Sequence, residues 1–208
     1  PLSRRCCARA EAYGILLFCH SFTAAEIKIV TSAPVFAKRL PALFRKAFKV
    51  DFDRTPEPAE TGKRIFLITD PGKLAAIREA YGSDPAVSLA NHINFAVLEE
   101  DHDRAAFLRG AFLAGGSVND PTKSYHLELV TSHQKVSDET YQLLLEMGFS
   151  PLDAQRGGSR ILYFKRSDTI VDFLTALGAP VCAMGVMEAK VEKDLRNGVN
   201  RRVNCETA

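Results

Sequence analysis

The chain carries the same pattern twice, 96 residues apart. The segment RIFLITDPGKLAAIREAYG (residues 64–82) recurs as RILYFKRSDTIVDFLTALG (residues 160–178), and AYGILLFCHSF (residues 12–22) recurs as LRGAFLAGGSV (residues 108–118). A twofold repeat of roughly a hundred residues is too long, and occurs too few times, for a solenoid. It indicates instead two pseudo-equivalent halves that bury a surface between them.

Each copy is predicted to run helix, strand, helix, short strand, second strand and helix, which defines an α+β fold. The segments EIKIVTS (residues 26–32) and HLELVTS (residues 126–132) alternate apolar and polar side chains, as half-buried strands do. A further short strand can follow the first helix of each copy, at the dipeptides SF (residues 21–22) and SV (residues 117–118).

Local sequence signals also predict the second helix of each copy, a hairpin turn and the connector between the copies. Residues 35–48 form a helix in the first copy, and residues 138–147 form its counterpart, with Ser137 as N-cap and Gly148 as C-cap. RGGSR (residues 156–160) is expected to be a hairpin turn, because paired glycines supply positive φ. The connector HINFAVLEE (residues 92–100) fits either a strand or a helix.

Small residues recur on one face of the first helix of each copy. Gly14 and Phe18 lie four residues apart, as do Gly110 and Ala114, so each pair shares a helix face. Small side chains let two helix backbones approach closely. We therefore expect these two helices to pack against each other at the boundary between the halves.

The five cysteines are odd in number and include no C-x-x-C pair, which indicates a reduced, cytosolic protein. Cys19 and His20, with Cys6 and Cys7, offer a zinc site as one interpretation. The alternative, which we favour, is that Cys19 ends an apolar helix as a small hydrophobic residue. Likewise, the remaining histidines show no spacing that suggests a shared metal, so we predict no metal and no cofactor.

Composition excludes a membrane protein and leaves nucleic-acid binding open. No apolar run approaches the roughly 18 residues of a membrane span. The chain begins with PLSRR and not with methionine, so we expect an excised fragment and not a secreted precursor. The net charge is only +2, but residues 1–50 contain nine Lys or Arg against two Asp or Glu. A basic first quarter is compatible with a phosphate-bearing partner.

The segment LRGAFLAGG (residues 108–116) resembles the LAGLIDADG motif of homing endonucleases, with matches at Leu108, Gly110, Ala114 and Gly116. The resemblance implies a fold of two pseudo-symmetric αββαββ halves packed through their motif helices. It also implies that the last acid of each motif holds the divalent metal that cleaves DNA. The acidic positions of the motif fall here on residues that cannot ligate a hard cation, namely Leu17, Cys19, Leu113 and Gly115.

Metal-dependent hydrolysis of a phosphodiester needs carboxylates that hold the metal on the scissile phosphate. Without them we predict that the chain is not an enzyme and has no catalytic residues. An active endonuclease is the less favoured alternative. It would need nearby acids, such as Asp120 and Glu128, to replace the missing ligands.

Three stretches are similar to the WhiA family of bacterial transcription regulators: CCARAEAYGILLF at the start, FLRGAFLAGGSVNDPTKSYHLE (residues 107–128) and NRRVNCETA (residues 200–208). The resemblance implies control of cell division and sporulation, and a helix-turn-helix domain beyond the C-terminal end of this chain. We expect residues 1–90 to form the first LAGLIDADG-like half, residues 91–188 the second, and residues 189–208 the start of a linker.

The implied partner is double-stranded promoter DNA, bound mainly through that C-terminal domain, in a cytoplasmic, nucleoid-associated protein. In such a fold the outer faces of the sheets dock on DNA, so outward-facing basic residues are the expected contacts. Alternation places Glu26, Lys28 and Val30 outward in one strand and His126, Glu128 and Val130 in the other. The DNA-binding candidates are Lys28, Arg45, Lys49, Lys63, Arg64, Arg156, Arg160, Lys165 and Arg166.

The sequence leaves a choice between two roles for this part of the protein. In the first it positions DNA or holds a partner as a non-catalytic scaffold. In the second it is a regulatory module that binds another protein or a ligand and has no DNA affinity of its own. The near-neutral charge and the glutamates on the strands favour the second role, because acids on a docking face repel phosphates.

Overall fold

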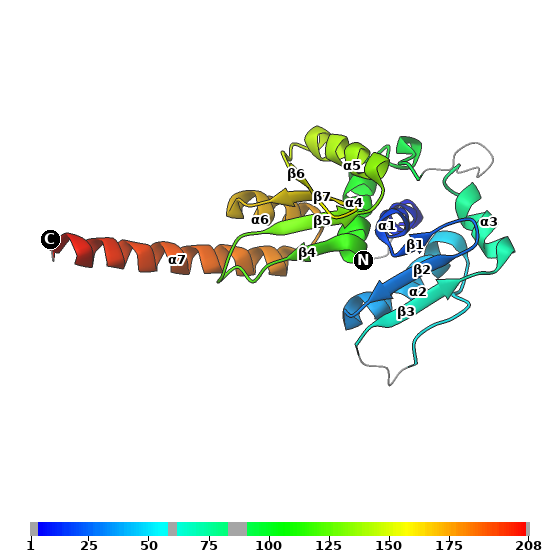
Figure 1. The fold of residues 1–208 in the computed structure, drawn as a ribbon, viewed down its shortest axis with the longest axis horizontal. Helices are drawn as coiled ribbons and strands as arrows, with labels where there is room; N and C mark the ends of the chain where they lie inside the picture. The colour runs from blue at the N-terminus through cyan, green and yellow to red at the C-terminus, as the bar shows by residue number, and fades with distance from the viewer. Residues whose placement is uncertain (1–3, 58–61, 83–90, 207–208) are drawn as a thin grey trace.

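The computed structural model describes residues 4–57, 62–82 and 91–206. Two helices, α1 (Arg5–Phe18) and α4 (Asp101–Gly115), lie side by side at the centre, with one antiparallel sheet on each side of the pair (Figure 1). These are the two helices that begin the repeated segments. The predicted α+β fold of two halves packed through their motif helices is confirmed.

The first half holds the smaller sheet. Its strands are β1 (Ser21–Phe22), β2 (Ile27–Thr31) and β3 (Arg64–Ile68), in the order β1-β2-β3. Helix α2 (Pro34–Phe48) follows β2, and helix α3 (Pro71–Glu79) follows β3. Among the described residues, the strand expected before β3 is reduced to an isolated bridge between Arg54 and Leu67.

The second half holds four strands in the order β4-β5-β7-β6. They are β4 (Gly116–Val118), β5 (Leu127–Thr131), β6 (Leu152–Arg156) and β7 (Ser159–Phe164), with α5 (Gln134–Glu146) after β5 and α6 (Ser167–Ala176) after β7. Strands β6 and β7 form the hairpin expected at RGGSR, where Gly157 has φ of 60°. The short strands expected at SF and SV are present as β1 and within β4.

Helix α5 begins earlier than the sequence indicates. Its N-cap is His133, and Ser137 lies inside the helix with 2% of its surface exposed, so the prediction of Ser137 as N-cap was wrong. The apolar face extends one turn back to Val136, and burial of that turn outweighs the local capping signal. The C-cap is Met147 and not Gly148 as predicted, although Gly148 follows it directly in the left-handed conformation, at φ of 84°. The undecided connector contains a short 3-10 helix at Phe95–Val97.

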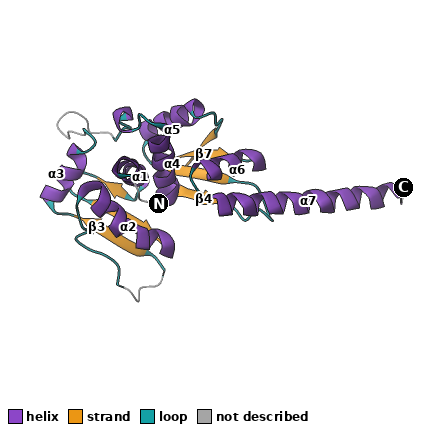
Figure 2. Cartoon of the chain, turned by 180° about the vertical axis from the view of Figure 1, so that it is seen from behind, coloured by secondary structure: helices purple, strands orange, loops and turns teal. Residues whose placement is uncertain are grey.

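The last helix, α7 (Pro180–Glu206), runs away from the two halves toward the C-terminal end (Figure 2). It passes without a break through the position where we expected the linker to begin, after residue 188. The core lies under both sheets and between α1 and α4, in one continuous cluster that includes Ile15, Ile29 and Phe107. None of the helices in the described part of the chain is long and apolar enough to cross a membrane.

Candidate functional site

The contact between α1 and α4 is built on two glycines, Gly14 and Gly110, which occupy equivalent positions in the repeat. A Cβ on Gly14 would overlap the carbonyl oxygen of Phe107 and lie 2.7 Å from the backbone nitrogen of Ala111. A Cβ on Gly110 would overlap the carbonyl oxygen of Glu11. Each backbone therefore rests directly on the other, and no larger residue fits at either position without moving a helix.

The two other residues expected at this contact lie near its C-terminal end. Phe18 is buried, and its Cδ1 lies 3.1 Å from where a Cβ of Gly115 would stand. Ala114 is half-buried and packs against the core cluster.

The acidic positions of the motif also lie at this end, and the residues there carry no carboxylate. A Cβ on Gly115 would come within 2.5 Å of the carbonyl oxygen of Val130, so a side chain at this position has no room. Leu17 is buried, and Leu113 packs against the core.

Cys19 is equally unsuited to hold a metal. Its thiol donates to the carbonyl oxygens of Leu16 and Ser21, at 3.2 and 3.1 Å. Burial raises the pKa of this thiol to about 12, so it stays protonated at neutral pH. Cys19 directly follows the last residue of α1, whereas Cys6 and Cys7 lie in the first turn of the same helix. The two groups are at opposite ends of α1, so the zinc site considered in the sequence analysis, with Cys19 and Cys6 or Cys7 as ligands, does not form.

The two acids that an active endonuclease would need, Asp120 and Glu128, already have hydrogen-bond or ion-pair partners. Asp120 accepts hydrogen bonds from the backbone nitrogen and the hydroxyl of Thr122, and these bonds lower its pKa. Glu128 lies 3.2 Å from His126 and 3.3 Å from Arg156. Burial raises the pKa of Glu128, but these two neighbours outweigh it and leave the pKa lowered.

A buried carboxylate that the sequence analysis missed lies in the middle of the seam. Glu11 in α1 is fully buried and binds Arg39 of α2 at 2.5 Å and Arg109 of α4 at 2.9 Å. Arg109 also donates to the carbonyl oxygen of Leu177 at 3.1 Å. Burial raises the pKa of Glu11, but the hydrogen bonds and charges of the two arginines outweigh it, so the pKa is lowered. The signal in the sequence was Glu11 itself, the single acid of α1, placed next to the apolar run that ends this helix.

Each sheet has one face against the core and one open face. In β2, Ile27 and Ile29 are buried while Lys28 and Val30 point outward, and in β5 the corresponding outward residues are Glu128 and Val130. Residues directly opposite each other on neighbouring strands share a face. The open faces therefore also carry Ile65, Leu67 and Tyr163, which pair with Val30, Lys28 and Glu128.

Four of the nine basic candidates belong to the open sides of the sheets. Lys28 faces outward in β2, and Lys63 is exposed directly before β3. Arg156 lies on the face of Glu128, to which it is paired, and the ammonium of Lys165 stands 5.3 Å from the centre of the Tyr163 ring. These residues come from both halves, so each sheet contributes cations to its outer surface.

The other five candidates lie on the side of the sheets that the helices cover. Arg64 pairs with Thr31 and shares a face with Phe66, and Arg160 reaches Asp138 of α5 at 3.7 Å. The last three belong to helices or their ends, namely Arg45 and Lys49 at the end of α2 and Arg166 at the N-cap of α6.

Sequence reasoning missed one outward cation. Arg54 is exposed and lies opposite Leu67 in the isolated bridge, on the same face as Lys28. No periodic pattern marks it, because the strand that would carry it is reduced to one bridge.

This geometry defines a class: two antiparallel sheets around a glycine-packed helix pair form a LAGLIDADG-type, homing-endonuclease-like domain. Residues 104–196 match the family model of the WhiA LAGLIDADG-like domain. The chain is 33% identical to the probable cell division protein WhiA of Ruminiclostridium cellulolyticum, over all of this chain and 69% of that protein. It is 31% identical to that of Alkaliphilus metalliredigens, over 98% of this chain and 68% of that protein. The chain belongs to the WhiA family.

Solved structures give the same fold. The N-terminal LAGLIDADG domain of DUF199/WhiA superposes with a TM-score of 0.63 at 20% identity, over 86% of each chain. Full-length DUF199/WhiA from Thermotoga maritima gives a TM-score of 0.70 at 20% identity, over 99% of this chain and 68% of that one. The homing endonuclease I-DmoI in complex with DNA and Mn gives 0.57 at 11% identity, over 84% of this chain and 97% of that one.

Proposed function

We propose that this part of the protein is a non-cleaving scaffold that positions double-stranded DNA for a transcription regulator of cell division and, in organisms that sporulate, of sporulation. One observation carries the proposal: the LAGLIDADG fold is kept, while its four acidic positions hold Leu17, Cys19, Leu113 and Gly115. Each sheet also has one face that the helices leave open, on which a duplex can dock. A fold without metal-binding carboxylates has no means to hydrolyse DNA by the metal route.

The packing at Gly115 supports the loss of cleavage. The carbonyl oxygen of Val130 occupies the space that an acidic side chain would need to enter. Cys19 is held by two carbonyl oxygens and stays protonated, which removes the other half of a metal pair. Both sites would therefore have to be rebuilt before a divalent ion could bind there.

The open faces supply the DNA contacts in this proposal. Lys28 and Arg54 lie on the outer face of the first sheet, and Arg156 and Lys165 on that of the second. I-DmoI, which shares the fold, has been solved in complex with DNA. Cations on both sheets would contact phosphates at two places along one duplex.

The charge balance indicates that this affinity is modest. Arg156 is paired with Glu128, and the net charge of the whole chain is only +2. Most of the promoter affinity is therefore assigned to the helix-turn-helix domain that the family resemblance implies, and residues 1–90 and 91–188 to the two halves of the scaffold. A cytoplasmic location at the nucleoid follows from this role.

A second candidate function is a regulatory module that binds another protein and has no DNA affinity. The open faces favour it in one respect, because they carry partly exposed apolar side chains between the cations. Val30, Ile65 and Leu67 lie around Lys28, and Leu152 of β6 is 51% exposed. An apolar surface with few charges suits a protein partner better than a phosphate backbone.

A single gel experiment separates these functions. Supercoiled plasmid is incubated with the protein and Mg²⁺ or Mn²⁺, and one half of each sample is deproteinised before electrophoresis. We expect retarded plasmid in the untreated half and unchanged supercoiled plasmid in the deproteinised half. Nicked or linear plasmid would overturn the loss of cleavage, and unretarded plasmid at low salt would favour the protein-binding module.

A further inference from the structure

A cluster of potential metal ligands lies at the opposite end of the seam from the motif acids. Cys6 and Cys7 belong to the first turn of α1, and His102 and Asp103 to the first turn of α4. One ligand atom from each of these four residues lies within 4.8 Å of all the others. The Sγ of Cys6 and the Nε2 of His102 are 3.5 Å apart.

The repeat explains why these residues meet. His102 follows Cys6 by 96 residues and Asp103 follows Cys7 by the same interval, which is the offset between Gly14 and Gly110. Cys6 and Cys7 are the second and third residues of α1, and His102 and Asp103 are the second and third residues of α4. Because α1 and α4 cross at their glycines, equivalent positions near the ends of the helices face each other, and each half contributes two ligands.

Asp103 is a buried acid, and one of its carboxylate oxygens has no hydrogen-bond donor among the described residues. Its residue is 5% exposed, and its Oδ1 accepts no hydrogen bond from the described residues. The ring of His102 lies 3.5 Å from this oxygen, close enough for attraction but without hydrogen-bond geometry. A buried carboxylate oxygen without a hydrogen bond costs free energy, which a cation would offset.

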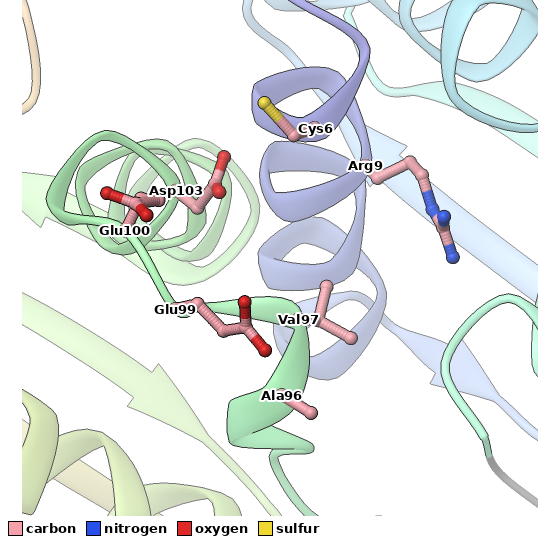
Figure 3. A pocket seen from close by; sticks show the side chains of 7 residues that line it. All are labelled: Cys6, Arg9, Ala96, Val97, Glu99, Glu100 and Asp103. Atoms are coloured by element: carbon pink, nitrogen blue, oxygen red, sulfur yellow. The ribbon is translucent and has the colours of Figure 1, made fainter.

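The surroundings of the cluster favour a cation. Cys6 and Asp103 line a pocket of about 260 Å³ together with Glu99 and Glu100, and Figure 3 shows Cys6 and Asp103 at the two helices that flank it. Arg9 also lines this pocket, but its guanidinium points away from Asp103 and donates to the carbonyl oxygen of Ala80. The backbone N–H groups of the first helical turns favour thiolate and carboxylate ligands.

We propose that Cys6, Cys7, His102 and Asp103 form a tetrahedral binding site for zinc or a similar borderline transition metal. Two thiolates and an imidazole select such a metal over Mg²⁺ or Ca²⁺, which take oxygen ligands. Tetrahedral zinc sets sulfur, nitrogen and oxygen ligands about 3.3–3.8 Å apart. The four ligand atoms, which lie within 4.8 Å of one another, would have to close by at most about 1–1.5 Å to reach that spacing.

All four ligands come from the protein, so the site is structural and not catalytic. It clamps the first turns of α1 and α4 and so joins the two halves at this end of the seam. On binding, the two thiols release their protons to solvent. One competing group must move: the exposed Arg4, whose Nη1 lies 3.5 Å from the Nε2 of His102, turns toward solvent.

The test uses the full chain, stripped of metal with a chelator and titrated with Co²⁺ as a spectroscopic probe. We expect one equivalent to give the visible bands of tetrahedral cobalt with thiolate-to-cobalt charge transfer, and Zn²⁺ to displace it. The double variant Cys6→Ser/Cys7→Ser should lose the charge-transfer band, and His102→Ala should bind at least about 10-fold more weakly. Cys182→Ser, an exposed cysteine of α7, is the matched control and should bind as the wild type does.

A second measurement keeps the proposal falsifiable if the variants fold poorly. Wild-type protein is alkylated with and without Zn²⁺, and each cysteine is followed by mass spectrometry. Zn²⁺ should protect Cys6 and Cys7 at least about 10-fold and leave Cys182 unchanged. The absence of a charge-transfer band in the wild type would overturn the proposal. So would an alkylation rate of Cys6 that Zn²⁺ leaves as unchanged as that of Cys182. Neither readout depends on DNA binding.

Discussion

Gly14 of α1 lies directly on the carbonyl oxygen of Phe107 of α4, and its repeat equivalent, Gly110, lies on the carbonyl oxygen of Glu11. The two contacts are related by the internal repeat, so the seam between the halves is symmetric at its closest point. These contacts fix the separation of the two helices at the boundary between the halves.

Substitution of either glycine should therefore destabilise the protein. Gly14→Ala and Gly110→Ala force the helices apart, and overpacking of this kind costs about 1–3 kcal/mol. Gly198→Ala is the matched control, because Gly198 is also helical but has open space around it. In an exposed helix that change should stabilise by about 0.5–1 kcal/mol. Urea unfolding measures all three, and seam variants as stable as the control would contradict the assigned contact.

Removal of the buried carboxylate should be similarly costly. Glu11→Ala leaves Arg39 and Arg109 in the seam without their shared partner, and breaking a buried ion pair on one side costs about 3–5 kcal/mol. The two arginines are about a quarter exposed, so we expect a value near the lower end. Asp51→Ala breaks the exposed pair with Arg45 and should cost less than about 1 kcal/mol. If urea unfolding showed the same loss of stability for Glu11→Ala and Asp51→Ala, the buried pairs of Glu11 would contribute no more to stability than an exposed pair.

The same carboxylate predicts a pH dependence. The pKa of Glu11 is lowered in the folded protein, so the unfolded chain takes up its proton first as the pH falls. The stabilisation is fully present above the unfolded value of about 4.5 and is lost as the pH drops from there through the lowered folded pKa. The wild type should therefore lose more stability than Glu11→Gln between pH 6 and pH 3, followed by urea unfolding at each pH. Parallel pH profiles for the two proteins would contradict this.

Restoration of the acid in the second motif should disrupt packing and not create a nuclease. Gly115→Asp places a side chain 2.5 Å from the carbonyl oxygen of Val130, and we expect a loss of about 1–3 kcal/mol. Gly198→Asp, at an exposed helical glycine with open space around it, should change stability by less than about 0.5 kcal/mol. Thermal unfolding compares the two, and plasmid nicking by Gly115→Asp with Mg²⁺ would show that the site accepts a metal after all.

The repeat made much of the fold predictable. Two copies of one pattern indicate two halves, and the small residues at Gly14 and Gly110 indicate where the halves meet. Strand alternation has a period of two, so the outward positions of Lys28 and Glu128 follow from the sequence once the strands are recognised. The resemblance to LAGLIDADG proteins supplied the order in which these elements pack.

What the sequence did not reveal depends on contacts between distant residues. The strand that would carry Arg54 is reduced to a bridge, and no local pattern predicts how many residues of a strand actually pair. Glu11 meets arginines 28 and 98 residues away, which only the packed fold brings together. The proximity of Cys6 and His102 could have been predicted from the sequence, because the repeat interval of 96 residues maps one position onto the other. It was missed because a cysteine and a histidine at these positions form no recognisable metal-binding motif.

The proposed function requires that the open sheet faces contact DNA. It is tested most directly by fluorescence anisotropy of a labelled duplex, titrated across a salt series with the wild type and two double variants. Lys28→Ala/Lys165→Ala removes one cation from each open face, and Arg45→Ala/Lys49→Ala removes two cations from the helix side. We predict weaker binding for the first variant, with the slope of log affinity against log salt reduced by about 2, and no change for the second. Equal effects of the two variants, or no binding by the wild type at low salt, would contradict the proposal.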